Sequence, residues 1–392
     1  MDFIRSTTIG ERIAFLLLAV FAAINFLPAY HQIALYVCIP GAFILSLFCK
    51  KHAQPPRQFK FIWLMYAWIV FSVLTSVDMS LSVAHVKMLV ACIMMLLSIV
   101  NLSSNKNLIP YLFFIWIVAY LSALVYVHTN LLDASFDFTR QRMDDETFNA
   151  NTLSYYTIYV TFILFLFSCI AESEKVRKFL ALCFLAMIPL SFYVAIITAS
   201  RQLLLIQVLN FSSLIYLKYL RGKLTISKTI AFAAIIVGII FFISKVSDVF
   251  LDSYLFQRAQ NGVEEDVRTQ LLKDAFNIGL QHPFTGVGPG CFILFSQSNN
   301  FSHCTYTELF ANSGFLAMLF YVLLVLSFVR IQWKRYRGSK DIVFMAYFIF
   351  GLVYILQNMF YVYYSHLWLF GFYILVYLHS ESYFKRNYTY EN

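Results

Sequence analysis

Twelve long apolar runs constrain this chain more than any other feature of its sequence. Each run is close to the roughly 20 residues that an α-helix needs to cross the hydrocarbon core of a bilayer. Such runs are typical of spanning helices, because a backbone in lipid must satisfy its polar groups internally. The predicted spans are 13–30, 32–49, 61–77, 82–100, 108–127, 152–171, 179–198, 202–220, 229–246, 313–330, 341–361 and 366–380.

The composition indicates that lipid is the solvent for most of the molecular surface. Hydrophobic residues make up 60% of the 392 residues and charged residues only 12%, whereas soluble domains average about 25% charged residues. The sequence contains no recognisable internal repeat or soluble domain. We therefore predict an all-α polytopic membrane protein of about twelve helices, which forms a single transmembrane domain over residues 1–392.

The basic residues predict the orientation of these helices. With a cytoplasmic N-terminus, 21 of the 29 lysines and arginines fall in inner segments, 7 fall in outer segments, and Lys87 lies within the fourth run. This distribution satisfies the positive-inside rule. We predict a bacterial inner-membrane protein with both termini in the cytoplasm. The net charge of +9 reflects this arrangement and not an affinity for nucleic acid.

Two predicted outer segments are long enough to contain functional residues. Residues 128–151 form a smaller periplasmic loop, and residues 247–312 form a major loop that we expect to be catalytic. Within the major loop, the apolar residues of 266–281 recur at helical spacing, which predicts an amphipathic helix. His282-Pro283 ends that helix.

A glycine-rich stretch, FTGVGPG, follows this predicted helix. Glycine accepts backbone conformations that other residues avoid, and it has no Cβ atom to hinder a close neighbour. We therefore expect a tight, closely approached backbone at Gly286, Gly288 and Gly290.

Two predicted outer arginines are candidates for binding an anion. Arg201 stands between two apolar runs in ITASRQLLL, and Arg268 lies on the predicted amphipathic helix. If both guanidinium groups meet in one cleft, they suit a diphosphate, since each can make bidentate contacts to phosphate oxygens. The alternatives are that Arg201 extends to the lipid headgroups and that Arg268 lies on a solvated helix face.

His303 is the candidate general base, because an imidazole near its ordinary pKa can accept a proton at neutral pH. A purely structural role for this histidine is the alternative. Glu308 ranks second as a base, and Glu308 and Tyr306 are further candidates for substrate binding. Lys87, which lies near His85 at the outer edge of the fourth run, is a candidate for holding an anionic headgroup or for reaching the interface.

The sequence gives no positive sign of a metal site or a cofactor. The acidic residues 144–146 contain no DxD-type pair, and the histidines and cysteines of the major loop lack the spacing of metal ligands. Cys291 and Cys304 could form a disulfide if the major loop is periplasmic. The other five cysteines fall in apolar runs and are expected to be packing residues.

The order of these motifs carries a family resemblance. Arg201 follows a span, RTQLL starts at Arg268, HPFTGVGPGCF follows, and HCTYTELFANSG leads into an apolar run. This order resembles the bacterial O-antigen polymerase and O-antigen ligase family, whose pattern is R-x-x-x-L, H-P-x-x-G-x-G-x-x-x-F and H-N-x-Y-L-E-x-x-x-x-x-G. Asn149-Ala150-Asn151 is also similar to the family's N-P-N. The likeness covers roughly residues 140–330, and Ala150 and Cys304 depart from it. The second departure means that any role of the family's Asn is absent or moved.

The resemblance implies a metal-independent, inverting glycosyltransferase with a GT-C-like fold and a periplasmic active site. Its donor would be an oligosaccharide on undecaprenyl diphosphate, with the diphosphate held by Arg201 and Arg268 and the acceptor served by His303. We predict a polymerase that joins repeat units, and a chain-length regulator is a candidate partner. The alternatives are a ligase that transfers the glycan to lipid A-core, and a polysaccharide-lipid transporter or flippase.

Overall fold

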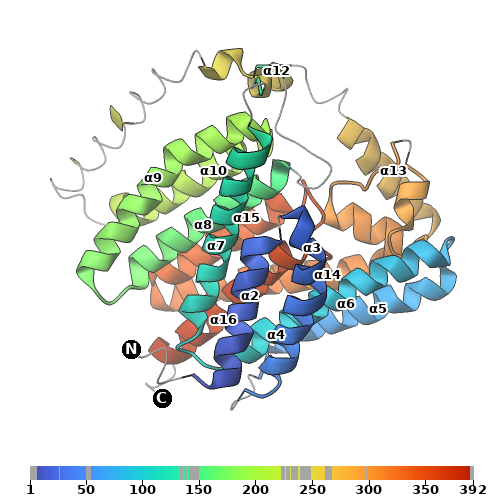
Figure 1. Ribbon diagram of the computed structural model, residues 1–392, viewed down its shortest axis with the longest axis horizontal. Coiled ribbons are helices and arrows are strands. Elements are labelled where there is room, and N and C mark those ends of the chain that lie inside the picture. The colour runs from blue at the N-terminus through green and yellow to red at the C-terminus, as the bar shows by residue number, and fades with distance from the viewer. Residues whose placement is uncertain are drawn as a thin grey trace.

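The computed structural model describes residues 7–25, 27–49, 54–132, 136–137, 139–140, 150–221, 226, 230, 237–238, 249–260, 267–296 and 298–388. This part of the chain is almost entirely helical and contains no strand (Figure 1). Its helices are α2 (Ile9–Ile24), α3 (His31–Ile33), α4 (Ile39–Ser46), α5 (Lys60–Ser72), α6 (Met79–Leu102), α7 (Ile109–Tyr126), α8 (Ala150–Ile170), α9 (Glu174–Thr198), α10 (Arg201–Ile215), α12 (Tyr254–Gln260), α13 (Val267–Gln281), α14 (Thr305–Ser339), α15 (Ile342–Gln357) and α16 (Leu367–Tyr388).

Seven helical segments among the described residues are long and apolar enough to cross a membrane. Each coincides with one of the predicted spans, and short 3-10 or π turns lengthen several of the α-helices. The segments are Arg57–Thr75, Met79–Leu102, Ile109–Leu131, Asn151–Ile170, Glu174–Thr198, Arg201–Leu220 and Thr305–Ser339. The predicted all-α architecture is therefore confirmed for the described residues, and the seven segments are consistent with a membrane protein. The total of twelve spans stays a prediction.

The other predicted spans take different forms. The runs 32–49 and 341–361 correspond to the shorter apolar helices His31–Ser46 and Ile342–Gln357. The run 13–30 corresponds to α2, which has 16 residues. The run 229–246 lies almost wholly outside the described residues.

Helices α8 and α16 form the centre of the bundle. In the spanning segment Asn151–Ile170, 78% of the apolar window is buried inside the protein. In α16 every residue from Trp368 to Ser380 is buried, and Phe372 stacks on Tyr159 of α8 with ring centroids 4.1 Å apart. Because protein surrounds α16, it can carry His379 and Ser380 internally, with Ser380 accepting a hydrogen bond from Gln332 at 2.9 Å.

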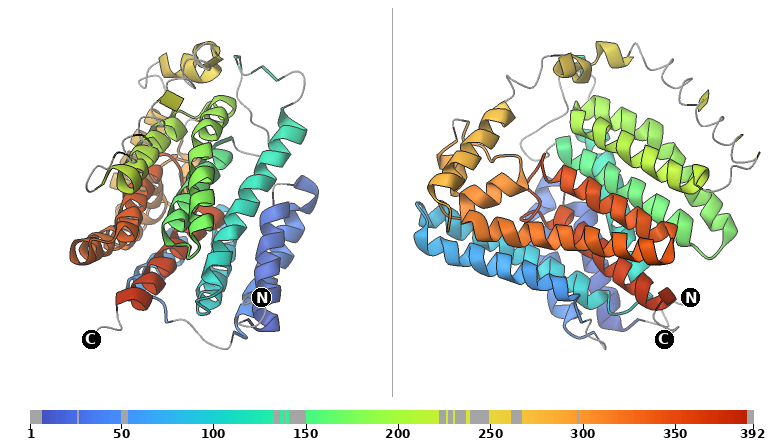
Figure 2. Two further views of the ribbon diagram at one scale, coloured as in Figure 1. Left: turned by 90° about the vertical axis from the view of Figure 1, so that its left-hand side faces the viewer. Right: turned by 180° about the vertical axis from the view of Figure 1, so that it is seen from behind.

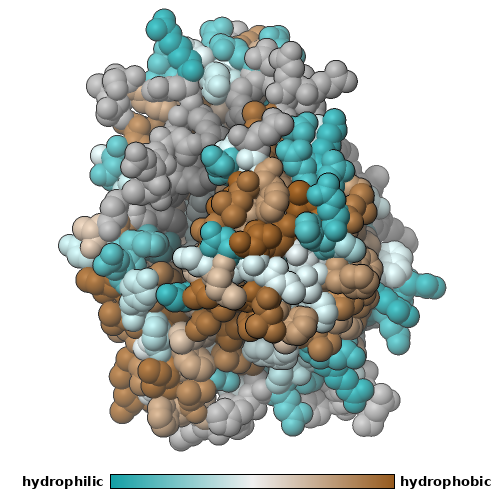
Figure 3. All heavy atoms as spheres, turned by 90° about the vertical axis from the view of Figure 1, so that its right-hand side faces the viewer, coloured by the Kyte–Doolittle hydropathy of each residue, from teal (hydrophilic) through white to brown (hydrophobic). Residues whose placement is uncertain are grey.

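The outward surface of the bundle is apolar. Large hydrophobic side chains such as Phe48 and Leu74 are each 73% exposed. Figure 3 shows one face of the molecule, on which hydrophobic side chains cover a broad area and hydrophilic ones gather toward its periphery. An exposed apolar area of this extent would be unfavourable in water and is suited to lipid.

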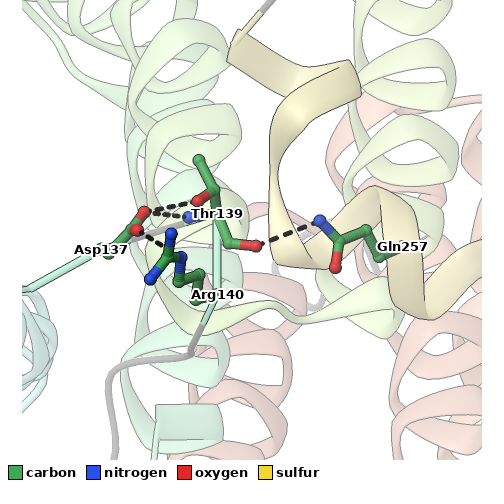
Figure 4. Close-up of polar contacts among 4 residues, drawn as sticks. All are labelled: Asp137, Thr139, Arg140 and Gln257. Atoms are coloured by element: carbon green, nitrogen blue, oxygen red, sulfur yellow. Dashed lines mark hydrogen bonds and ion pairs between the residues drawn. The ribbon is translucent and has the colours of Figure 1, made fainter.

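The loop helices gather toward one end of the bundle. Helix α2 begins and α16 ends at one end, whereas α12 and α13 lie toward the other (Figure 2). At the α12 end, Gln257 donates a hydrogen bond to the carbonyl oxygen of Thr139 at 3.1 Å (Figure 4). Asp137 holds this turn by accepting from the backbone amide of Thr139 at 2.9 Å and by pairing with Arg140 at 3.3 Å. The two predicted outer loops therefore touch each other.

Candidate functional site

A cavity of about 470 Å³ lies among α10, α12, α13 and the segments that precede α14 and α16. This volume lies within the usual range for small-molecule sites, which are mostly apolar with a few convergent polar groups. The lining follows that pattern and includes all three residues predicted from the sequence to be catalytic. It consists of Arg201, Gln202, Leu204, Leu205, Phe250, Leu255, Arg268, Thr269, Leu272, Ser302, His303, Met359 and Phe360.

Arg201 is positioned by a sharp turn between two long helices. Helix α9 ends at Thr198, and Ala199 adopts a left-handed conformation with φ of 46°. Ser200 then caps α10 by accepting a hydrogen bond from the amide of Leu203. Arg201 is consequently the first residue of α10, where the positive end of the helix dipole adds to its own charge.

Arg268 is positioned by the helix that the sequence predicted. This helix forms as α13 over Val267–Gln281, and it buries Leu271, Ala275 and Gly279 against the rest of the protein. Arg268 stands in its first turn, so a second helix N-terminus reaches the cavity. Positive helix ends that carry arginines favour anions, and phosphate groups above all.

His303 occupies a backbone conformation that few residues adopt. Its φ is 57°, a left-handed value in which histidine occurs more often than most non-glycine residues. The hydroxyl of Ser302 donates to the carbonyl oxygen of Cys304 at 3.0 Å and accepts from the Cys304 amide at 3.3 Å. These two bonds brace the turn on both sides of His303, and the Phe301 ring lies 4.2 Å from the imidazole, centroid to centroid.

Glu308 fixes this turn to the rest of the protein. Its Oε2 accepts a hydrogen bond from the Ser302 amide at 2.6 Å, and its Oε1 accepts one from Asn312 Nδ2 at 2.7 Å. The Asn312 Oδ1 in turn accepts from the Phe292 amide at 2.8 Å. Glu308 is 4% exposed and does not line the cavity. Because both carboxylate oxygens hold neighbouring groups, its position suits orientation of the His303 turn better than proton transfer.

The glycine-rich stretch packs against the beginning of α14, next to the His303 turn. Gly286 and Gly288 have positive φ angles, and a Cβ atom on either would lie 2.4 Å or less from the Asn312 backbone or the Ser76 side chain. The amides of Val287 and Gly288 bond to the carbonyl oxygens of Ala311 and Asn312, each at 2.9 Å. The close backbone approach predicted from the sequence is confirmed. It joins this stretch to α14 and not to the cavity.

Two other candidates from the sequence lie away from the cavity. Tyr306 donates to the carbonyl oxygen of Ile355 at 3.3 Å, and Lys87 is exposed on α6. Neither residue lines the cavity. His85, near Lys87, instead contacts the hydroxyl of Tyr364 at 3.2 Å.

Cys291 and Cys304, which could have formed a disulfide, are both free and buried. The Cys291 thiol lies 3.3 Å from the hydroxyls of Ser76 and Ser82, so polar neighbours at the start of α6 occupy the space around it. Cys304 immediately precedes α14. The cysteines in the apolar runs are also free.

Among the residues of the cavity wall that the sequence analysis did not single out is a buried polar one, Gln202. Its Nε2 donates to the hydroxyl of Tyr155 at 2.8 Å. The Gln202 Oε1 is buried and has no hydrogen-bond partner among the described residues. A buried acceptor without a donor is unfavourable, so this oxygen suits a donor supplied by a ligand. The available signal was a glutamine directly after Arg201 at the start of an apolar run.

Aromatic residues flank the His303 side of the cavity. The Tyr361 ring meets Phe301 edge-on at 5.6 Å, and His366 lies 5.8 Å from Tyr361.

No group of three or more His, Cys, Asp or Glu side chains in the described residues is arranged to hold a metal ion. The acidic residues 144–146 and Asn149 lie outside those residues, whereas Asn151 is buried in the first turn of α8.

Comparison with known proteins identified no relative, so a function can be inferred only from the residues of this chain. No family model matches the sequence. No curated protein matches it either.

Proposed function

We propose that this chain is a glycosyltransferase that polymerises oligosaccharide repeat units carried on undecaprenyl diphosphate. The proposal places the reaction at the outer face of a bacterial inner membrane, with both termini in the cytoplasm. One observation carries it. Arg201, Arg268 and His303 come from three separate segments and line the same cavity.

The two arginines would bind the diphosphate of the donor. Both stand in the first turn of a helix, so guanidinium charge and helix dipole act on the same anion. During transfer, the bond between the anomeric carbon and the diphosphate breaks, and its electron pair leaves with the diphosphate. Positive groups already in position stabilise this growing charge without reorganising, which is a large source of catalysis in polar reactions.

His303 would serve the acceptor. A hydroxyl of the acceptor sugar attacks the anomeric carbon from the face opposite the diphosphate, so the new glycosidic bond has inverted configuration. The imidazole takes the hydroxyl proton as that bond forms. We assign this role to His303 and not to Glu308, because Glu308 is outside the cavity lining and both of its oxygens hold other groups.

The test is transfer by purified protein supplied with a lipid-diphosphate repeat unit and no ion gradient. Arg201→Ala and Arg268→Ala should each lower turnover by about a hundredfold or more, as loss of an oxyanion-stabilising group does. His303→Ala should lower it by about as much, because it removes the general base. The control is Lys273→Ala, which removes an exposed cation from the same helix as Arg268 but outside the cavity. Full activity in both arginine variants would exclude this site. Gradient-dependent export without transfer would indicate a transporter.

The acceptor distinguishes a polymerase from a ligase, and both reactions use the same chemistry. A polymerase should lengthen the lipid-linked repeat without added lipid A-core. A ligase should need that acceptor and add the glycan to it. In cells, loss of a polymerase should leave core carrying one repeat, whereas loss of a ligase should leave core bare.

A further inference from the structure

A second cavity lies at the end of the bundle where α2 begins and α16 ends. Its volume is about 640 Å³. It lies where α5 begins and α6, α14 and α16 end, so helix termini surround it. The lining is Gln54, Pro55, Pro56, Arg57, Gln58, Ser103, Ser104, Lys106, Ile331, Arg335, Leu378, Glu381, Ser382 and Lys385.

The lining combines several cationic side chains with apolar ones. Four side chains are cationic, Glu381 is the single carboxylate, and Ile331 and Leu378 are apolar. Four different segments of the chain supply the cations, so no single solvated helix face accounts for the cluster. Converging lysines and arginines are suited to a phosphate group, because they provide several charge-assisted hydrogen bonds.

Arg335 lines the cavity, and its side chain is held in place by neighbouring residues. Its side chain is 11% exposed, and its Nη2 lies 2.7 Å from Glu381 Oε1. The guanidinium group also lies over the Phe384 ring, 4.4 Å from the centroid. Its Nη1 is buried and has no hydrogen-bond partner among the described residues. A buried charged donor without an acceptor is costly, and a phosphate oxygen in the cavity would supply the acceptor.

We propose that this cavity binds the phosphate group of an anionic lipid headgroup. The spanning helices end around it, which puts it at the depth of the headgroups once the apolar surface is in lipid. Basic pockets between the ends of membrane helices suit such headgroups. The three exposed cations, Arg57, Lys106 and Lys385, attract the phosphate, and Arg335 receives it. This site is independent of the transferase proposal, because it shares no residue with the Arg201 cavity.

The experiment is a titration of the purified full-length protein in neutral detergent, read by native mass spectrometry. The probes are cardiolipin, phosphatidylcholine and inorganic phosphate. We expect saturable binding of cardiolipin, weakened by salt, and little retention of phosphatidylcholine. Arg57→Gln and Lys106→Gln should each weaken cardiolipin binding about fivefold, the effect of one basic residue near an anionic surface.

Two further variants distinguish a built site from general surface attraction. Glu381→Gln removes the competing carboxylate, so it should strengthen cardiolipin binding while it weakens the pairing of Arg335. Lys334→Gln removes an exposed cation that neighbours Arg335 but does not line the cavity, and it should leave binding unchanged. Thermal unfolding without lipid shows whether each variant is folded.

Three results would overturn the proposal. The first is an equal loss of binding in Lys334→Gln and Arg57→Gln, which would indicate general attraction. The second is unchanged or weaker binding in folded Glu381→Gln, which would make the Arg335 pair purely structural. The third is saturable binding of inorganic phosphate without saturable binding of cardiolipin, which would assign the cavity to a soluble phosphate compound.

Discussion

At the scale of single residues, Gln202 and Gln207 have opposite surroundings although both are buried on α10. Gln207 donates to Thr161 and Ser191, each at 2.9 Å, and its oxygen accepts from Asn210 at 3.2 Å. Gln202 donates to Tyr155 alone among these described contacts, and its oxygen has no partner. The hydrogen bonds of Gln207 are therefore all satisfied within the protein. Gln202 keeps one buried acceptor, its Oε1, that a ligand could satisfy.

Replacing Gln202 with Met should therefore impair transfer more than folding. The loss of a hydrogen bond to the acceptor sugar corresponds to about 1–2 kcal/mol, so kcat/KM for the acceptor should fall by about tenfold or somewhat more. The matched control is Gln207→Met, which should lower thermal stability while activity per folded molecule is kept. The measurement is kcat/KM for the acceptor in both variants at a fixed donor concentration. Equal kcat/KM in wild type and Gln202→Met would contradict a role in acceptor binding.

At the scale of secondary-structure elements, α14 depends on an interruption at Gly314. That residue has φ of 79° and ψ of −178° inside an otherwise helical segment. The interruption lets the carbonyl oxygens of Ala311 and Asn312 accept from the glycine-rich stretch. It also lets the Phe315 amide bond to the carbonyl oxygen of Pro283 at 2.8 Å. The same break therefore attaches the loop after α13 and supports the network that holds His303.

Gly314→Ala should destabilise the protein severely. The backbone angles belong to a region that is essentially restricted to glycine, and a Cβ atom would lie 2.0 Å from the Phe284 carbonyl oxygen. We expect a loss of at least about 3 kcal/mol. Gly338→Ala on the same helix meets nothing within 4 Å, so it should be neutral or stabilising by up to about 1 kcal/mol. Thermal unfolding in detergent measures both. A stable Gly314→Ala protein would show that the interruption is dispensable.

At the scale of the whole molecule, the two charged cavities lie toward opposite ends of the helical bundle. The Arg201 cavity adjoins the segment that leads into α14, and the Arg335 cavity adjoins the other end of the same helix. If the bundle spans a membrane in the predicted orientation, the first cavity faces the periplasm and the second faces the cytoplasm.

Thiol labelling tests this orientation directly. Lys273 on α13 and Lys334 on α14 are both exposed, and the seven native cysteines are buried or half-buried. In spheroplasts, a membrane-impermeant maleimide should label Lys273→Cys, whereas Lys334→Cys should react only after lysis. The parent protein measures background labelling from native thiols. The reverse pattern would turn the proposed active site toward the cytoplasm.

The sequence predicted those parts of the fold that depend on local patterns. Six apolar runs predicted helices long enough to cross a membrane to within five residues at each end, whereas the run 313–330 proved to be part of the longer segment Thr305–Ser339. The period within 266–281 predicted α13 to within one residue. The sequence did not show that α16 is central, because an apolar run looks the same whether lipid or protein surrounds it. It also could not decide which predicted spans would form shorter helices.

The charged and titratable residues of the candidate site could be predicted from residue type and position. The residues whose role depends on three-dimensional contacts could not. Two arginines and one histidine were candidates from their residue type and position, and they line one cavity. Glu308 looked like a base because sequence distance put it near His303. Its actual partners, Ser302 and Asn312, are fixed by three-dimensional packing. Gln202 was missed because its significance depends on Tyr155, which comes from another helix.

The glycine-rich stretch is bonded to the early part of the chain as well as to α14. The Val77 amide donates to the Val287 carbonyl oxygen at 3.0 Å, and the Ser82 hydroxyl donates to that of Pro289 at 3.0 Å. These bonds join segments more than 200 residues apart. A fragment that kept every recognisable motif but began after α6 would lose the scaffold behind its own histidine. The candidate site is accordingly not an independent fragment. A shortened protein that keeps the site would also have to keep the amino-terminal helices.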